Sequence, residues 1–349
     1  MKKILAMLMM CVMSFSLAGC GTTASNEGSE VSTDVQAEDT AAASSDEEFV
    51  IGITQWPGSY VWYGTQELGY FEKQGVNATV KMFDNYSDGM NALTAGNIDA
   101  YVLSYSDAMS PYINGADFKI VMIEDYSAGS DGLVVKPEIT SVEELKGKTV
   151  ATEIGTVDHM FLNKCLEAAG MSESDVQLTN MSIGDAGNAF IAGQVDAAVI
   201  WDPSLSMAVD AGGVVLSSTK DYPGLIPAVM AVNGDVLESR RDDVKKVMRA
   251  WFDSLDGYES NHEEFVGAVA EGAEISVEDF EMLMEGVDLI SLDDNLPAFE
   301  VSDDYVSLVT CGMEHCEFLK SVDMISEIPD SIDDLIDGSL ISEIAQEAK

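Results

Sequence analysis

Acidic side chains are concentrated in a small set of loops that follow predicted strands. They are Asp107, Asp131, Glu153 and Asp202, with Glu124 and Asp125 close by in sequence. The same loops contain Trp56 and Trp201, but no Lys or Arg. A buried carboxylate is costly unless it is paired, and the face of an indole ring attracts cations. These residue types therefore predict a site for a positively charged group, most plainly an amine or an amidinium.

The candidate ligand-binding positions come from all of these loops. They are Gln55, Trp56, Ser104, Tyr105, Ser106, Asp131, Glu153, Gly155, Thr156, Trp201 and Asp202. A zwitterion such as an aminosulfonate also fits, with its anionic end on the N–H groups where Gly155 and Thr156 open a helix. Asp158 lies in the first turn of that helix, so its carboxylate competes with the anionic end of the ligand for the positive field of the helix N-terminus. Two alternatives remain open: the ligand is a pure anion such as nitrate, held by N–H groups and hydroxyls, or the acids simply face solvent.

The elements that would position these loops occur twice in the chain. Residues 88–102 read DGMNALTAGNIDAYV, and residues 185–199 read DAGNAFIAGQVDAAV. Each copy predicts a helix, a Gly that ends it in a left-handed turn, and a short apolar strand. Further strands are predicted at 49–53, 76–83, 149–153 and 176–181. Each half is then β-α-β-α-β, which is typical of a mostly parallel sheet with helical crossovers.

The predicted fold class is therefore α/β, with two lobes, a mostly parallel sheet and flanking helices in each, and a helical C-terminal part. The chain is predicted to cross between lobes near Asp131 and near Pro227. Lobe 1 would comprise residues 49–131 and 228–349, and lobe 2 residues 132–227. Helices are predicted over 240–256, 261–271, 276–289, 302–320 and 331–346. Since ligands of such sheets bind at the carboxyl ends of strands, the acidic loops should line one cleft between the lobes.

The N-terminus has the pattern of a bacterial export signal. Lys2 and Lys3 precede an apolar run over 4–18 that is too short to span a bilayer. The tetrapeptide LAGC at 17–20 matches a lipobox, so residues 1–19 are predicted to be a signal peptide and Cys20 a lipidated N-terminus. Residues 21–48 contain no Lys, Arg or aromatic residue, which predicts a disordered acidic tether over 20–48.

Several segments, together with the lipobox, resemble the nitrate, sulfonate and taurine binding proteins of ABC importers. They are residues 67–75 (ELGYFEKQG), 145–150 (LKGKTV) and 192–203 (AGQVDAAVIWDP). The thiamine-pyrimidine precursor binders belong to the same broad family. The resemblance covers roughly residues 49–260. It implies a type II periplasmic-binding fold, no catalysis, and delivery of a small solute to a membrane permease and its ATPase. It also implies cleft positions at Trp56, Asp131, Trp201 and Asp202.

Composition and motifs exclude several other classes. With 17 Lys and Arg against 62 Asp and Glu, the net charge is −45, which excludes a nucleic-acid reader. His159, His262 and His315 are far apart in sequence, so neither a metal site nor a cofactor is predicted. Some thiamine-pyrimidine synthases share the implied fold, but their clustered-cysteine motif is missing from this sequence. A sensory receptor stays open as an alternative, and we expect an extracytoplasmic, lipid-anchored monomer.

Overall fold

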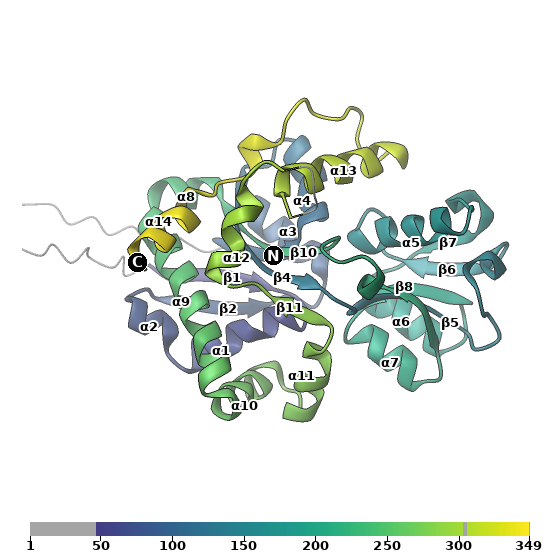
Figure 1. The fold of residues 1–349 in the computed structure, drawn as a ribbon, viewed down its shortest axis with the longest axis horizontal. Coiled ribbons are helices and arrows are strands. Elements are labelled where there is room, and N and C mark those ends of the chain that lie inside the picture. The colour runs from purple at the N-terminus through teal and green to yellow at the C-terminus, as the bar shows by residue number, and fades with distance from the viewer. Residues whose placement is uncertain (1–46, 303–305, 349) are drawn as a thin grey trace, which may run out of the picture. The chain divides into compact units, whose positions relative to one another are not determined.

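The computed structural model describes residues 47–302 and 306–348 (Figure 1). The predicted signal peptide, Cys20 and nearly all of the predicted tether lie outside the described residues. Two β-sheets organise the described part. The first contains β1 Phe49–Ile53, β2 Ala78–Met82, β3 Ala100–Ser104, β4 Phe118–Ser127, β10 Pro227–Asn233 and β11 Val287–Leu289. The second contains β5 Asp131–Val135, β6 Thr149–Thr152, β7 Gln177–Asn180, β8 Ala197–Trp201 and β9 Val214–Ser218.

The two sheets repeat one strand order. The first is ordered β11-β4-β10-β3-β1-β2 and the second β7-β6-β8-β5-β9, so β2-β1-β3-β10-β4 corresponds to β7-β6-β8-β5-β9. In each sheet the three strands of the β-α-β-α-β half are parallel. Strands β10 and β5 run antiparallel beside β3 and β8, because each enters after the chain has crossed from the other sheet. Both sheets are therefore mixed, and the α/β fold class predicted from the duplication is confirmed.

Two aspartates at matching positions of the repeat make equivalent hydrogen bonds, one in each half of the repeat. Asp99 accepts a hydrogen bond from the N–H of Val50 at 2.7 Å, and Asp196 accepts one from the N–H of Thr149 at 3.1 Å. Val50 and Thr149 lie at the start of the first strand in their respective halves. Each aspartate also forms an ion pair with a basic residue. The symmetry of these contacts gives both residues a structural role, outside any cleft.

Helices cover the sheets and connect their strands (Figure 1). They are α1 Val61–Glu67, α2 Tyr70–Gln74, α3 Tyr86–Thr94, α4 Tyr105–Ile113, α5 Val157–Ala168, α6 Ile183–Ile191, α7 Ser204–Asp210, α8 Gly234–Ser239, α9 Arg241–Ser260, α10 His262–Ala273, α11 Val277–Met284, α12 Leu292–Asn295, α13 Leu308–Ser321 and α14 Ser339–Glu347. Side chains of Asn85 and Ser182 cap the equivalent helices α3 and α6, which fixes where each begins. Among the described helices, none is both long and apolar enough to cross a membrane.

The C-terminal helices differ from the prediction in three places. The helix predicted over 276–289 ends at Met284, and β11 follows it as an edge strand beside β4. Gly286 makes this turn against the first crossing segment, where its carbonyl accepts a hydrogen bond from the N–H of Ala128 at 2.8 Å. The other two predicted helices begin late, at Leu308 and Ser339. Before Ser339 the chain pairs with β4 instead, so tertiary pairing overrides the helical pattern.

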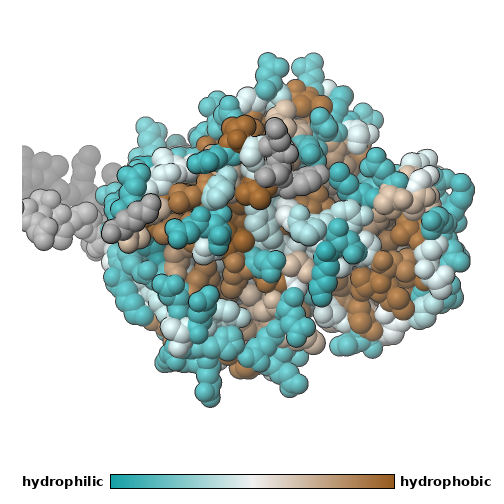
Figure 2. All heavy atoms as spheres, viewed as in Figure 1, coloured by the Kyte–Doolittle hydropathy of each residue, from teal (hydrophilic) through white to brown (hydrophobic). Residues whose placement is uncertain are grey.

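The core of each sheet is apolar on both faces, as expected for strands covered by helices. Figure 2 shows a largely hydrophilic surface with hydrophobic side chains gathered over α6 and α7. Ile191, Met207 and Val209 are among the exposed apolar residues there. Cys165, Cys311 and Cys316 are buried free thiols. Within the described residues, no group of three or more His, Cys, Asp or Glu side chains is arranged to hold a metal ion.

Candidate functional site

Two adjoining cavities lie where residues of both sheets meet, beyond the carboxyl ends of β1, β3 and β8. The inner cavity has a volume of about 20 Å³ and the outer about 230 Å³. Thr54, Tyr86 and Trp201 line both cavities. The inner one is completed by Trp56, Ser59, Val102, Leu103, Ser104, Asp131, Ile226 and Ala228. The outer one is completed by Gln55, Asp84, Asn85, Glu153, Ser182, Ile183, Gly184, Asp185, Asn188, Pro203 and Ser204.

The chain passes twice between the sheets beside these cavities. We call the residues around the first sheet the first lobe and those around the second sheet, 131–218, the second lobe. The crossings, 127–131 and 218–227, are hydrogen-bonded to each other. The Ser127 hydroxyl lies 2.7 Å from that of Thr219, and the N–H of Gly129 donates to Thr219 Oγ1 at 2.8 Å. Two linked crossing segments of this kind form a hinge.

Three aromatic side chains surround the inner cavity, and hydrogen bonds or ring contacts hold them. The Trp56 ring is 9 % exposed, and its Nε1–H donates to both carboxylate oxygens of Asp125, at 3.1 and 3.0 Å. Tyr86 donates from its hydroxyl to Asp107 at 2.7 Å. The Tyr86 ring also meets the Trp201 ring edge-on, with centroids 5.4 Å apart. Since Tyr86 belongs to the first lobe and Trp201 to the second, this ring contact closes the cavity from both sides.

Asp131 is the carboxylate that lines the inner cavity. It is the first residue of β5, lies opposite Trp201 in the β5–β8 pairing, and is 1 % exposed. Its Oδ2 has no hydrogen-bond partner among the described residues. Burial raises the pKa of Asp131 to about 7, although the Ser127 hydroxyl opposes the shift. Asp158 lies beside it, fully buried, and its pKa is raised well above the ordinary value by burial and by the charge of Asp131.

Other acids around the cavities are also shifted toward the protonated form. Burial raises the pKa of Asp107 to about 7, against hydrogen bonds from Tyr86 and Ser106. Burial likewise raises the pKa of Asp125 to about 7. The pKa of Asp202 is raised in the same direction and for the same reason. The residues that line the two cavities include no Lys, Arg or His, so no basic side chain neutralises these acids from the cavity walls.

The remaining predicted positions fall into two groups. Gln55 and Glu153 line the outer cavity, and Ser104 lines the inner one. Glu153 also accepts a hydrogen bond from Ser87 of the first lobe at 2.9 Å. By contrast, Tyr105 is fully buried in the first-lobe core, with its ring 6.0 Å from that of His315 on α13. The structure therefore brings Gln55, Ser104 and Glu153 to the cavities and leaves Tyr105 in the core.

Ser106 and Asp202 support neighbouring groups, and neither is among the lining residues. Ser106 donates to Asp107 at 3.0 Å, and Asp202 accepts a hydrogen bond from the N–H of Ser206 at 2.8 Å, in the first turn of α7. Both side chains are nearly buried. Their contacts stabilise the loops that follow β3 and β8.

The start of α5 bonds to groups of the protein itself. The N–H of Gly155 donates to His159 Nδ1 at 3.2 Å, and the Thr156 hydroxyl donates to the Glu153 carbonyl at 2.7 Å. The backbone N–H of Val157 at the start of α5 acts on Asp107 of the first lobe and lowers the pKa of that carboxyl, against the larger effect of burial. An anionic end of a zwitterion would compete here with carboxylates already in place.

Tyr86 is the main cavity residue that the sequence reasoning missed. It lies two residues before the Asp88 copy of the repeat, and Ile183 lies two residues before the Asp185 copy. These two residues begin the equivalent helices α3 and α6, and both line the outer cavity. The two residues differ in type, so the repeat itself does not point to them; only their equivalent places at the start of α3 and α6 link them.

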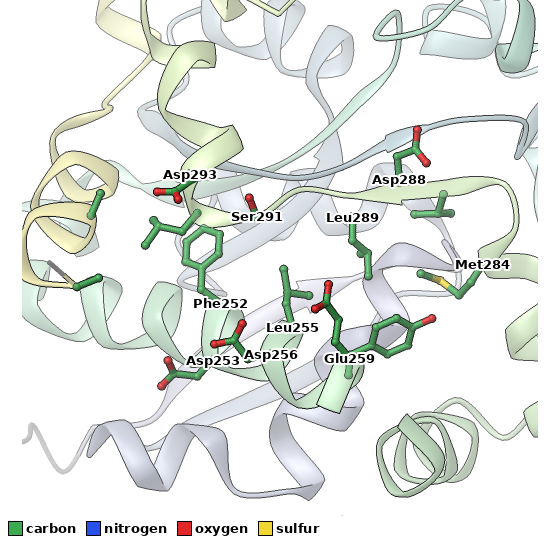
Figure 3. Close-up of a pocket in the computed structure, with 15 residues that line it drawn as sticks. Phe252, Asp253, Leu255, Asp256, Glu259, Met284, Asp288, Leu289, Ser291 and Asp293 are labelled. Carbon is green, nitrogen blue, oxygen red and sulfur yellow. The ribbon is translucent and has the colours of Figure 1, made fainter. Parts of the chain in front are cut away.

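A larger cavity of about 820 Å³ lies within the first lobe, and it shares no lining residue with the two cavities described above (Figure 3). Its walls come from α9, the β11 region, α12 and α14. Phe252, Leu255 and Leu289 form apolar wall, and Asp253 and Asp256 project from α9 (Figure 3). Both of these aspartates are exposed, so water already solvates their charge. Unlike Asp131, they need no ligand to neutralise them.

Comparisons with known proteins agree with this architecture. A protein named as a binding protein in Brucella abortus is 28 % identical over 222 residues, covering 62 % of this chain and 69 % of that protein. A protein of Bacillus subtilis named as an aliphatic sulfonates-binding protein is 25 % identical over 259 residues, covering 72 % of each.

Solved structures show the same fold at lower identity. The alkanesulfonate-binding protein of Xanthomonas axonopodis, bound to MOPS, superposes with a TM-score of 0.70 at 18 % identity, covering 85 % of this chain and 100 % of that one. The desulfurization enzyme DSZB superposes with a TM-score of 0.65 at 14 % identity, covering 87 % and 100 %. The fold is thus shared by binding proteins and by at least one enzyme.

The chain forms two lobes, two crossing segments that join them, and cavities lined from both lobes. This architecture is that of the two-lobed proteins with the periplasmic-binding fold. Residues 56–264 match the family described as NMT1/THI5 like, and the chain belongs to that family.

Proposed function

We propose that the protein is the extracytoplasmic solute-binding component of an ABC importer and takes its solute between the two lobes. The observation that carries the proposal is the pair of cavities beside the hinge, where Tyr86 and Trp201 meet from opposite lobes. A solute held by both lobes stabilises the closed arrangement through contacts that the open arrangement lacks. Closure would then signal occupancy to a permease and its ATPase.

The names of the relatives support a binding role. They include aliphatic sulfonates and taurine as ligands of those proteins, and sulfonate binding is therefore the second candidate for this chain. The buried acids next to the cavity do not form an obvious catalytic set, because no His, Lys, Arg or Cys is among the lining residues, and the lining Ser and Thr hydroxyls therefore have no basic side chain beside them to activate them. We therefore favour binding over the enzymatic role that DSZB has on the same fold.

The location and boundaries follow from the sequence. We propose that residues 1–19 are removed, that Cys20 carries the lipid anchor, and that 20–48 tether the lobes to the membrane. The bounds proposed from the sequence are 49–131 and 228–349 for lobe 1 and 132–227 for lobe 2; they differ from the lobes defined above in assigning Asp131, which begins β5, to lobe 1 and the second crossing to lobe 2. This arrangement holds a solute-binding protein close to its permease while leaving the lobes free to open and close.

The proposed function is tested by ligand-induced stabilisation and closure. A thermal-shift screen of amines, amidines, aminosulfonates, simple anions and aminopyrimidines should identify at least one stabilising solute. At 100 times its dissociation constant, such a solute adds about 2.7 kcal/mol to the free energy of unfolding. The same solute should quench or shift Trp fluorescence, since Trp56 and Trp201 line the inner cavity. A complete absence of stabilising solutes across these classes would contradict a solute-binding role.

A further inference from the structure

Resting on the proposed function, we propose that the solute is a small primary amine whose ammonium group enters the inner cavity, binds Asp131 and lies among the rings of Trp56, Tyr86 and Trp201. The other end of the solute lies in the outer cavity and is neutral or cationic, not anionic.

The first argument is the unpartnered oxygen of Asp131. Its side chain is 1 % exposed, lines the inner cavity, and leaves Oδ2 without a hydrogen-bond partner among the described residues. A buried acceptor left unpaired costs free energy, and more so when it is charged. Asp158 is the other carboxyl beside Asp131, and its pKa is raised well above the ordinary value by burial and by the charge of Asp131, so it is the one that holds a proton. The pair keeps one negative charge, which an ammonium group neutralises while it donates to Oδ2 of Asp131.

The second argument is the composition of the wall around that oxygen. Trp56, Tyr86 and Trp201 line the same cavity, and aromatic faces attract ammonium ions most strongly when water is excluded. Trp56 is held by Asp125, and Tyr86 by Asp107. These hydrogen bonds fix the two side chains in the cavity wall, so the rings are already in place when a cation enters.

The third argument is size. The inner cavity measures about 20 Å³, and a single water needs roughly 10–15 Å³ by the same measure. It therefore admits one group of about the size of water, which fits –NH3⁺ and excludes a trimethylammonium or a sulfonate group. The body of the solute must lie in the outer cavity of about 230 Å³.

The fourth argument is the charge of the outer cavity. Its wall carries Asp84, Glu153 and Asp185, and no Lys, Arg or His is among its lining residues. Ser182, Asn188 and Ser204 supply neutral hydrogen-bonding groups there. A sulfonate or carboxylate at this end would face these acids. Asp84 and Asp185 are exposed, so water weakens their repulsion, and the half-buried Glu153 contributes most of the selectivity against zwitterions and anions.

The test uses two-carbon probes that differ only in their end groups. Ethanolamine and ethylenediamine should bind in calorimetry and raise the melting temperature, whereas ethylene glycol and isethionate should do neither. Taurine should bind at least about 10-fold more weakly than ethanolamine, because its sulfonate faces the outer acids. If taurine or isethionate binds more tightly than ethanolamine, or if neither amine binds, the inference is overturned. Binding of isethionate with closure would leave the proposed solute-binding function intact.

Two variants locate the site. Asp131→Asn keeps the shape of the side chain and should lower ethanolamine affinity about 10- to 100-fold, while the ligand-free melting temperature stays the same or rises. Asp256→Asn, in the separate cavity of Figure 3, should leave affinity unchanged. Retained affinity in Asp131→Asn, or a loss in Asp256→Asn, would overturn the assignment.

Discussion

The indole N–H of Trp56 donates to both carboxylate oxygens of Asp125, 69 residues away along the chain, at 3.1 and 3.0 Å. The bond joins the loop after β1 to the end of β4 and sets the orientation of a ring that lines the inner cavity. Gly58 is required beside it, because a Cβ at this position would collide with Asp125 Oδ2. One hydrogen-bonded pair thus connects the packing of the first lobe to the wall of the site.

Trp56→Phe should weaken both stability and solute binding. It leaves the buried Asp125 acceptor unpaired, which lowers the free energy of unfolding by about 1–3 kcal/mol. The matched control is Trp62→Phe, since Trp62 donates to Glu124 at 2.9 Å and is fully buried in the first-lobe core. Urea denaturation should show a loss in both variants, but calorimetry should show weaker binding only in Trp56→Phe. Equal solute affinity in the two variants would show that Trp56 is not part of the binding site.

Ligand-free stability should fall as the pH rises from about 4 to about 7. Burial raises the pKa of Asp107, Asp125 and Asp131 to about 7, whereas in an unfolded chain an Asp titrates near 3.9. Between these values the folded state binds more protons than the unfolded state, so the stabilisation present below pH 4 is lost toward pH 7. Melting temperatures across this range check the sign. Asp131→Asn should show a shallower decline, and a parent protein that gains stability over this interval would contradict the burial of these acids.

Amine affinity should change with pH in the opposite direction. The ammonium binds ionised Asp131, so protonation of this carboxyl below pH 7 should weaken ethanolamine binding by up to about tenfold per pH unit. Asp158, Asp125 and Asp202 are the acids that act on Asp131 in the folded protein. Lys220, which packs over Gly129 of the first crossing, is exposed. Calorimetry at pH 5.5, 6.5 and 7.5 measures how ethanolamine affinity changes with pH. The Asp131→Asn variant should show most of this pH dependence removed. Affinity that increases on acidification would rule out Asp131 as the ammonium partner.

Sequence patterns predicted the fold more fully than the site. The repeat at Asp88 and Asp185 predicted equivalent halves because each copy combines a helix, a glycine turn and an apolar strand, and the two sheets have matching strand orders. Trp56, Asp131 and Trp201 were singled out as residues that follow or begin strands, and all three line one cavity. Side-chain direction could not be predicted in the same way. Tyr105 follows β3 directly and Trp56 lies three residues after the end of β1, yet the Tyr105 ring packs into the core.

The C-terminal part was the least predictable from local pattern. Residues 287–289 have an apolar spacing compatible with a helix, but they pair with β4 at the edge of the sheet and form strand β11. Residue 336 similarly bridges to Ile120 of the same strand before α14 begins. These contacts join segments more than 150 residues apart, and no window of neighbouring residues contains the information that selects them.

Closure of the lobes should depend on a hydrogen bond between Ser87 and Glu153. The Ser87 hydroxyl of the first lobe donates to Glu153 of the second at 2.9 Å, at a partly exposed site. Ser87→Ala should lower solute affinity only about 2- to 10-fold, the range expected for one neutral-to-charged hydrogen bond near solvent. Solution scattering with saturating solute should show compaction of the parent protein and a smaller compact fraction of Ser87→Ala at limiting solute. A scattering profile of the parent that is unchanged by saturating solute would exclude closure.

The predicted lipid anchor requires only one of the two cysteines in the N-terminal segment. Cys11 lies within the apolar run and Cys20 at the end of the LAGC motif, so only Cys20 should become the modified N-terminus. Cys20→Ala should shift the protein from the membrane fraction to the soluble or secreted fraction, because one removed thiol eliminates the acyl chains that hold it. Cys11→Ala should leave fractionation unchanged, since an apolar run tolerates Ala for Cys. Fractionation after a carbonate wash measures both variants, with intact mass of the membrane-bound form as a second readout. Membrane retention of Cys20→Ala, or an unmodified mass for the parent, would show that the protein is held at the membrane by something other than a lipid on Cys20.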